Sequence, residues 1–176
     1  MNKFILPLTL LILFSFTNKQ PNTKTSSKKT TTISNGLYKV DNLYDLKINI
    51  ETTKDNIQYL VVSIILKKDS YFVSPNDNNN FSGKFNLDLG NYQNVVFDGT
   101  IIETPLSIKK TNTNNITVNN INVNTVYKQK LAIGLNPDFE VFGRVQFTIE
   151  PRCTYEEIPF KIIYKNNKMT ITEAIC

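Results

Sequence analysis

The sequence predicts an all-β fold, an immunoglobulin-like antiparallel β-sandwich with about eight or nine strands. Apolar residues alternate with polar ones over short runs, which is the period of a half-buried strand. No window of a dozen residues shows the apolar stripe of an amphipathic helix. Clusters of Asn, Asp, Gly and Pro separate the runs at the spacing expected of a sandwich. A closed barrel is the alternative for the same pattern.

Eight runs are typical of strands. The run 57–66 is rich in β-branched residues and long enough for a central strand, whereas 46–50 and 85–89 alternate strictly. The segment 111–125 is either a long loop or a polar edge strand. The expected strands are 46–50, 57–66, 85–89, 93–97, 123–133, 140–149, 159–164 and 168–171. The expected turns are 53–56, 74–80, 98–99, 136–138 and 166–167.

The first residues have the pattern of an export signal. A short basic start ending at Lys3 precedes an uncharged, mostly apolar core at 4–16, which is shorter than the roughly 20 residues of a membrane span. Residues 1–16 are therefore interpreted as a signal peptide, and the chain as exported to the periplasm or the extracellular space. Because no small-x-small cleavage pattern follows, a short uncleaved anchor is the alternative interpretation, and membrane contact is expected only in that case.

Residues 17–35 are polar and lysine-rich, which predicts a disordered tether before a single domain at 36–176. The net charge is +5, but five of the 20 basic residues lie before position 33, and the first acidic residue is Asp41. From position 33 onward fifteen basic residues meet fifteen acidic ones. The domain is formally neutral, so we expect no binding of nucleic acid or of an anionic membrane.

The chain contains no histidine and only two cysteines and six glycines. These counts exclude a Ser-His-Asp or Cys-His catalytic group, a histidine-based zinc site and a Cys₄ site, and no Gly-rich phosphate loop is present. No metal or cofactor is predicted. Carboxylate-only catalysis remains, but the adjacent pair Glu156 and Glu157 is expected on opposite faces of an extended chain, as a solvated acidic turn.

Aromatic residues leave two interpretations open. They could form a stacking surface for a sugar or a peptide, or they could fill the core of the sandwich, which is their usual place. The set is Tyr71, Phe72, Phe81, Tyr92, Phe97, Tyr127, Phe139, Phe142, Phe147, Tyr155 and Phe160. The first interpretation corresponds to a carbohydrate-binding or adhesion module.

The sharpest candidate for chemistry is Cys153, in an acidic, proline-flanked loop at 150–157 that separates two strand-like runs. A reactive thiol needs exposure and a positive potential. Arg152 supplies one positive charge and Tyr155 lies nearby, but Glu150 and the pair at 156–157 oppose that charge. A buried or structural cysteine is therefore favoured over a redox thiol. A disulfide from Cys153 to the terminal Cys176 is a further possibility for an oxidising compartment.

Several segments, taken in order, resemble the N-terminal domain of the thiol:disulfide interchange protein family. The resemblance covers about 36–172 and rests on 102–105, 127–131, 138–147, the cysteine loop and 158–160. It implies an immunoglobulin-like periplasmic module that passes reducing equivalents to a protein partner in the cell envelope. The family pattern places a second cysteine a few residues after the first, whereas this chain has Pro159 there and no cysteine before Cys176.

Three functions therefore stand. The first is an exported domain that acts by protein–protein contact, the second a thiol–disulfide relay partner that uses Cys153, and the third the carbohydrate-binding or adhesion module. Because a shared fold does not carry a function with it, the contact function is the primary expectation, and no enzymatic activity is assigned.

Overall fold

The computed structural model describes residues 36–111, 117–135 and 138–174, and this part of the chain contains strands and no helix. The strands are β1 (Leu37–Val40), β2 (Tyr44–Thr52), β3 (Gln58–Leu66), β4 (Phe72–Val73), β5 (Asn86–Asp88), β6 (Val95–Thr104), β7 (Ile108–Thr111), β8 (Thr117–Ile121), β9 (Thr125–Ile133), β10 (Phe139–Ile149), β11 (Thr154–Lys165) and β12 (Lys168–Glu173). The predicted all-β fold is confirmed.

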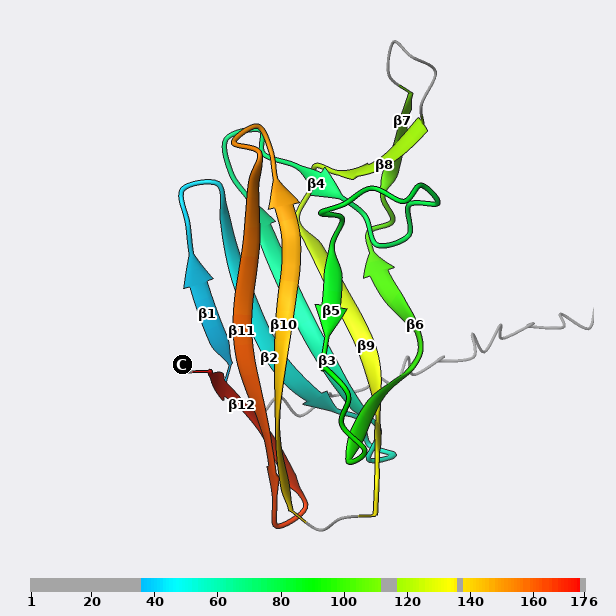
Figure 1. The fold of residues 1–176 in the computed structure, drawn as a ribbon, viewed down its shortest axis with the longest axis vertical. Coiled ribbons are helices and arrows are strands. Elements are labelled where there is room, and N and C mark those ends of the chain that lie inside the picture. The colour runs from blue at the N-terminus through cyan, green and yellow to red at the C-terminus, as the bar shows by residue number, and fades with distance from the viewer. Residues whose placement is uncertain (1–35, 112–116, 136–137, 175–176) are drawn as a thin grey trace, which may run out of the picture.

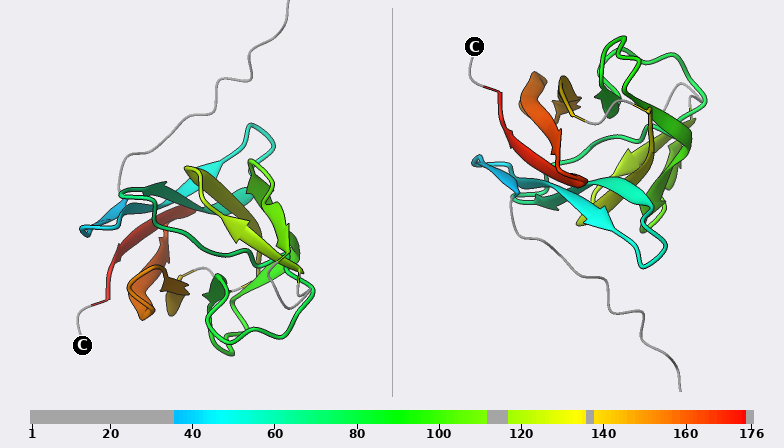
Figure 2. Two further views of the ribbon diagram at one scale, coloured as in Figure 1. Left: turned by 90° about the horizontal axis from the view of Figure 1, so that it is seen from above. Right: turned by 90° about the horizontal axis from the view of Figure 1, so that it is seen from below.

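The strands form three antiparallel sheets (Figure 1). The five-stranded sheet has the order β1-β2-β3-β9-β6, and the four-stranded sheet has the order β12-β11-β10-β5. Seen along the strands in Figure 2, these two sheets lie as separate layers of a sandwich. Within the described ranges their edge strands do not pair with one another, so the sandwich and not the closed barrel is the architecture. A small sheet, β4-β8-β7, projects from one end.

The core lies between the two large sheets and is built by strict alternation. In β10 the odd positions from Phe139 to Ile149 are buried and the even ones are not, as the sequence predicts. Five aromatic rings, from Tyr44, Phe72, Phe85, Tyr127 and Phe147, contact one another at the centre, with Phe85 and Tyr127 stacked at 3.9 Å between centroids. Most of the aromatic residues are thus core residues.

The described residues form twelve strands where eight or nine were expected. Strands β1 and β4 carry no alternation long enough to be recognised, because an edge strand and a two-residue strand need few apolar positions. The turn predicted at 98–99 is wrong. Both residues lie inside β6, where the register shifts between Asp98 and Ile102 and Gly99 has a φ of 72°, which marks a bulge rather than a chain reversal.

Where the structure describes the segment 111–125, it is neither one long loop nor an edge strand. Strand β8 pairs with β7 on one side and with β4 on the other, so it is the central strand of the small sheet. The carboxylate of Asp77 holds this sheet to the preceding loop, because it accepts hydrogen bonds from the backbone N–H groups of Asn119 (2.6 Å) and Asn79 (2.7 Å). The small sheet is therefore tied to the loop 74–80 by this buried acid, together with hydrogen bonds from the Ser74 N–H to the carbonyl of Asn119 (2.8 Å) and from the Asn79 amide to the carbonyl of Thr117 (2.7 Å).

The predictions for the N-terminal part, a signal peptide or short anchor at 1–16 and a tether at 17–35, lie outside the described residues, and so does Cys176. In the part of the chain that is described, no helix could span a membrane.

Candidate functional site

Cys153 lies at the tip of the hairpin that joins β10 to β11. The two strands pair from Phe139 with Tyr164 to Ile149 with Thr154, so the acidic loop is shorter than predicted: strand β11 resumes at Thr154 rather than at Pro159. Cys153 itself has a φ of 52°, in the left-handed region that closes the turn. Only residues 150–153 separate the two strands.

The thiol of Cys153 is exposed, so the expectation that the neighbouring strands bury it is wrong. A four-residue turn at a hairpin tip projects beyond the sheet and leaves no side chains to cover it. The Sγ donates a 2.9 Å hydrogen bond to Oε2 of Glu150. This bond, together with the negative charge of Glu150, raises the pKa of the thiol above its ordinary value.

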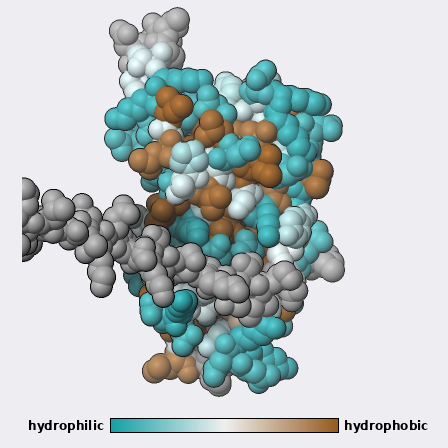
Figure 3. Space-filling view, turned by 180° about the vertical axis from the view of Figure 1, so that it is seen from behind, coloured by the Kyte–Doolittle hydropathy of each residue, from teal (hydrophilic) through white to brown (hydrophobic). Residues whose placement is uncertain are grey.

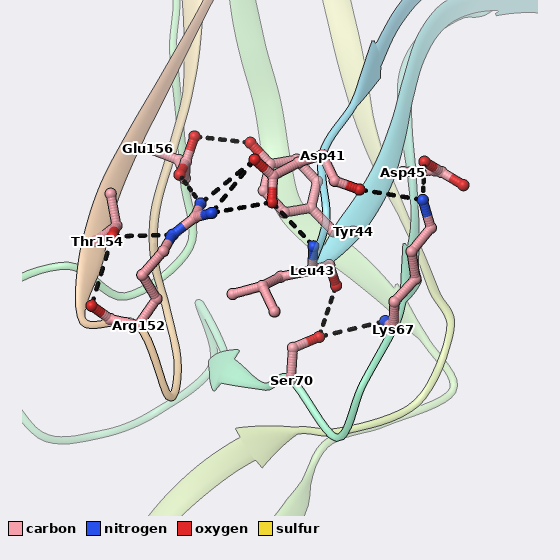
Figure 4. Close-up of polar contacts among 9 residues, drawn as sticks. All are labelled: Asp41, Leu43, Tyr44, Asp45, Lys67, Ser70, Arg152, Thr154 and Glu156. Atoms are coloured by element: carbon pink, nitrogen blue, oxygen red, sulfur yellow. Dashed lines mark hydrogen bonds and ion pairs between the residues drawn. The ribbon is translucent and has the colours of Figure 1, made fainter.

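Arg152 does not face the thiol. Its guanidinium group donates hydrogen bonds to Oδ1 of Asp41 (3.2 Å), Oε1 of Glu156 (2.6 Å) and Oγ1 of Thr154 (3.0 Å), as Figure 4 shows. The positive charge predicted to activate Cys153 is therefore paired with two carboxylates on other segments.

A polar clasp, formed by Asp41, Tyr44, Arg152 and Glu156, joins the two large sheets at this end of the sandwich (Figure 4). The hydroxyl of Tyr44 on β2 donates a 2.7 Å hydrogen bond to Oε2 of Glu156 on β11. Burial, followed by this bond to a carboxylate, raises the pKa of Tyr44. The backbone N–H of Leu43 and then Arg152 lower the pKa of Asp41.

The adjacent acids point apart, as predicted. Glu156 faces the clasp, with a side chain 15% exposed, whereas Glu157 accepts a hydrogen bond from Gln146 (2.9 Å) and lies 3.6 Å from the guanidinium group of Arg144. The two carboxylates cannot flank one substrate bond. The expectation of a merely solvated turn is wrong for Glu156, which is largely covered by its partners.

Tyr155 is half exposed and pairs with Thr148 across the hairpin. Within the described residues, neither a hydrogen bond nor a ring contact joins Tyr155 to the thiol. Cys153, Arg152 and Tyr155 are thus close in sequence, but their side chains contact different partners. The proposed partner Cys176 lies outside the described residues. No cluster of three metal-ligating side chains occurs in the described ranges.

A second candidate site lies on the outer face of the five-stranded sheet. We define the apolar face as Val61, Ile65, Ile102 and Val126 on this sheet, of which Val61 is only 2% exposed, together with Leu106 and Ile108 in the segment that follows β6 and Val123 in the segment that precedes β9. Ile102 and Val61 flank Lys128 on β9, and Val126 lies one row further along, between Ser63 and Thr104. Leu106 is 75% exposed and Ile65 is 50% exposed. Figure 3 shows brown side chains gathered over the upper part of this side of the molecule.

The apolar face contains a shallow hollow of about 470 Å³. Val61 and Val126 lie at this hollow, and Lys47, Glu51 and Lys128 surround it. Lys128 is paired with Glu51 at 2.5 Å, whereas the ammonium group of Lys47 lies 5.3 Å from the centroid of the Tyr38 ring. Asn49, Ser63 and Thr104 complete the lining, so the hollow offers both apolar and polar groups, as contact surfaces commonly do.

One feature of the sequence indicates this face. The run 57–66 is apolar at both odd and even positions, which indicates a strand that is covered on both sides. In the structure the even positions Leu60, Val62 and Ile64 fill the core, and the odd positions Val61 and Ile65 belong to the apolar face. The polar clasp had no such signal.

The chain was compared with protein-family models, with curated proteins and with solved structures, and none of them matches it.

Proposed function

We propose that this chain is an exported domain that acts by protein–protein contact in the cell envelope, and that the apolar face is its contact surface. The observation that carries the proposal is the exposure of several large aliphatic side chains on β3, on β6 and in the segment that follows β6. Three of them, Ile102, Leu106 and Ile108, are each more than half exposed. Contiguous exposed apolar surface with a polar rim marks interaction sites.

The partner proposed is a protein rather than a nucleic acid. The charged groups around the hollow are of both signs, with Lys128 bound to Glu51. A polyanion would need a continuous basic stripe. The formally neutral domain supports the same choice.

Thiol–disulfide exchange through Cys153 is the second candidate, and the exposure of the thiol favours it. A partner's disulfide could reach the tip of the hairpin. Against it stands Glu150, whose carboxylate accepts the thiol proton's hydrogen bond and raises the pKa of the group, so that little thiolate forms near neutral pH.

Site-specific photo-crosslinking on the full chain, in its native host, tests the contact proposal. A photoreactive phenylalanine analogue at Leu106 is expected to give one discrete adduct, and Ile102→Lys is expected to reduce the yield by placing a charge within the face. Matched control positions are Leu135 and Phe142, which are also exposed apolar residues but lie outside the apolar face. Equal adducts at all three positions, or no adduct at Leu106, would contradict the proposal.

A further inference from the structure

A cleft of about 550 Å³ opens at the end of the sandwich opposite to Cys153. It lies between two hairpins, one from each large sheet: the β2–β3 hairpin, through Thr52, Lys54 and Gln58, and the β11–β12 hairpin, through Asn167 and Lys168. Both hairpins are at the lower end of Figure 1. The volume falls within the range of about 300–1,000 Å³ that is usual for small-molecule sites.

The two hairpins that border the cleft are fixed by their own turn chemistry. In the β2–β3 turn, the backbone N–H of Asn56 donates to the carbonyl of Thr53 (3.1 Å), and the N–H of Ile57 donates to the Thr53 hydroxyl (3.1 Å). In the β11–β12 turn, Asn166 and Asn167 have φ values of 51° and 61°. A ligand would therefore meet a largely preformed border, which limits the ordering cost of binding.

The lining combines an aromatic ring with amide groups. The ring of Tyr164 is stacked on Phe139 at 5.1 Å between centroids, which holds it in place, and its hydroxyl donates to Oδ1 of Asn167 (3.5 Å). Gln58 is 8% exposed, and its Oε1 accepts a 2.7 Å hydrogen bond from Thr52. Its Nε2 donates a hydrogen bond to no described residue and is accessible to solvent. The Gln58 amide can therefore donate to a ligand in the cleft.

Two ammonium groups and no carboxylate line the cleft. Neither Lys54 nor Lys168 has an ion-pair partner among the described residues, and Lys168 pairs across its hairpin with a third cation, Lys165. The nearby Asp138 accepts a hydrogen bond from the backbone of Asn166. Asp55, in the same turn as Lys54, lies outside the lining, so the charge within the lining itself is positive and favours an anion.

We infer that this end cleft binds a small polyhydroxylated anion, namely a sugar that carries a carboxylate or a phosphate. The amide groups of Gln58 and Asn167 would bond the hydroxyl groups, the ring of Tyr164 would contact the apolar C–H groups of the sugar, and Lys54 and Lys168 would pair with the acidic group. This site is distant from the apolar face, and the inference does not depend on the protein-contact proposal.

Titrations of the folded full chain, followed by NMR of the side-chain amide groups, test the inference. The probes are glucuronate, glucose 6-phosphate, glucose and inorganic phosphate. We expect saturable shifts of the Gln58 and Asn167 amides with at least one acidic sugar below about 10 mM, and binding of glucose about tenfold weaker. Whichever acidic sugar binds more tightly identifies the acidic group as carboxylate or phosphate.

Variants locate the site. Lys54→Gln and Lys168→Gln are each expected to weaken binding of the acidic sugar by about fivefold, and Gln58→Leu by a similar factor, because each removes one polar contact. Lys109→Gln makes the same charge change on β7 and is expected to leave the affinity unchanged. Thermal unfolding of each variant shows that it is folded before it is titrated.

Three outcomes would overturn the inference: no saturable shift with either acidic sugar, the same affinity for inorganic phosphate as for the sugars, which would mean an adventitious ion only, or equal weakening by Lys109→Gln and Lys168→Gln.

Discussion

The hydroxyl of Tyr44 on β2 lies 2.7 Å from Oε2 of Glu156 on β11, and this hydrogen bond links the two large sheets at the end that carries the cysteine hairpin. The ring of Tyr44 packs edge-on against Phe147 at 5.2 Å. One residue thus belongs both to the aromatic core and to the polar clasp. The clasp thus adds side-chain hydrogen bonds between the two sheets, close to the backbone bridge that pairs Tyr71 with Glu150 at the end of β10.

Tyr44→Phe removes this hydrogen bond and keeps the ring. We expect the free energy of unfolding to fall by about 1–2 kcal/mol, since the bond is made to a charged group that is mostly covered. Urea unfolding measures the change. Tyr155→Phe is the control, because Tyr155 is 55% exposed, and it is expected to alter stability by less than about 0.5 kcal/mol. Equal losses of stability in the two variants would contradict a stabilising role for the polar clasp.

The buried carboxylate of Asp77 predicts a dependence of stability on pH. Burial acts to raise its pKa, but hydrogen bonds from Asn119 and Asn79 outweigh burial, so the pKa lies below the ordinary value of 3.8. A group whose pKa is lowered in the folded state stabilises the fold at pH values above its unfolded-state pKa. This stabilisation is lost as the pH falls through the folded-state pKa.

Asp77→Asn is therefore expected to lower the free energy of unfolding by about 1–2 kcal/mol at pH 7, and by less once the pH falls through the folded-state pKa of the wild-type carboxylate. Denaturant unfolding over pH 2–7 checks both values. The exposed Asp69 supplies the control variant, Asp69→Asn, whose difference in stability from the wild type is not expected to change with pH. A constant difference between Asp77→Asn and wild type at every pH would contradict the assignment.

The reactivity of Cys153 depends on Glu150. Because the carboxylate raises the pKa of the thiol, we expect slow labelling near neutral pH and a midpoint of the rate–pH profile above the free value of about 8.5. Glu150→Gln removes the charge and should move the midpoint down. Cys176→Ser serves as the background for all measurements. Rapid labelling near pH 7 would instead support thiol–disulfide exchange.

Much of the sandwich follows from local pattern, and its departures have local causes. The alternation in β10 was sufficient to predict both the strand and its buried face. The acidic start of β11 was interpreted as loop, because Glu156 and Glu157 suit a solvated turn, yet pairing with Phe147 and Gln146 on β10 makes it strand. Pairing between strands overrode the composition of the segment.

The candidate sites were harder to predict, because their parts are distant in the sequence. Asp41 and Arg152 are 111 positions apart, and nothing near either residue indicates the other. Cys153 was found from its surroundings in sequence, but whether Arg152 would face the thiol depended on Asp41, which the sequence cannot place. Likewise the end cleft exists only because two separate hairpins end at the same level.

Gly143 on β10 is expected to tolerate no side chain. A Cβ atom there would overlap the ring of Phe160, which is fully buried, and would lie 2.8 Å from the carbonyl oxygen of Asp88. We expect Gly143→Ala to lower the free energy of unfolding by about 1–3 kcal/mol. Gly99→Ala is the comparison: no atom lies within 4 Å of its Cβ position, but its φ is 72°, so only backbone strain of about 1 kcal/mol applies. A larger loss at Gly99 would show that β10 can shift.

Tyr127 gives the sharpest test of the hydrogen-bond argument, because it is the counterpart of Tyr44. Its ring is fully buried and stacked on Phe85, but its hydroxyl has no hydrogen-bond partner among the described residues. The residue opposite in the sheet is Glu103, whose carboxylate is occupied by the Ser74 hydroxyl and the Ser107 N–H, each at 2.6 Å. Burial, then the charge of Glu103 and the closeness of its carboxylate to the phenol group, raise the pKa of Tyr127, although the two groups do not meet the geometry of a hydrogen bond.

Removing a buried hydroxyl group that lacks a partner relieves a desolvation cost, whereas removing one that is bonded forfeits the bond. Tyr127→Phe is therefore expected to leave the free energy of unfolding unchanged or to raise it by up to about 1 kcal/mol, opposite in sign to Tyr44→Phe. The two variants make the same chemical change within one aromatic cluster, so urea unfolding compares them directly. A loss at Tyr127 as large as that at Tyr44 would mean that its hydroxyl is bonded to Glu103 in solution, and the carboxylate would then hold three donors rather than two.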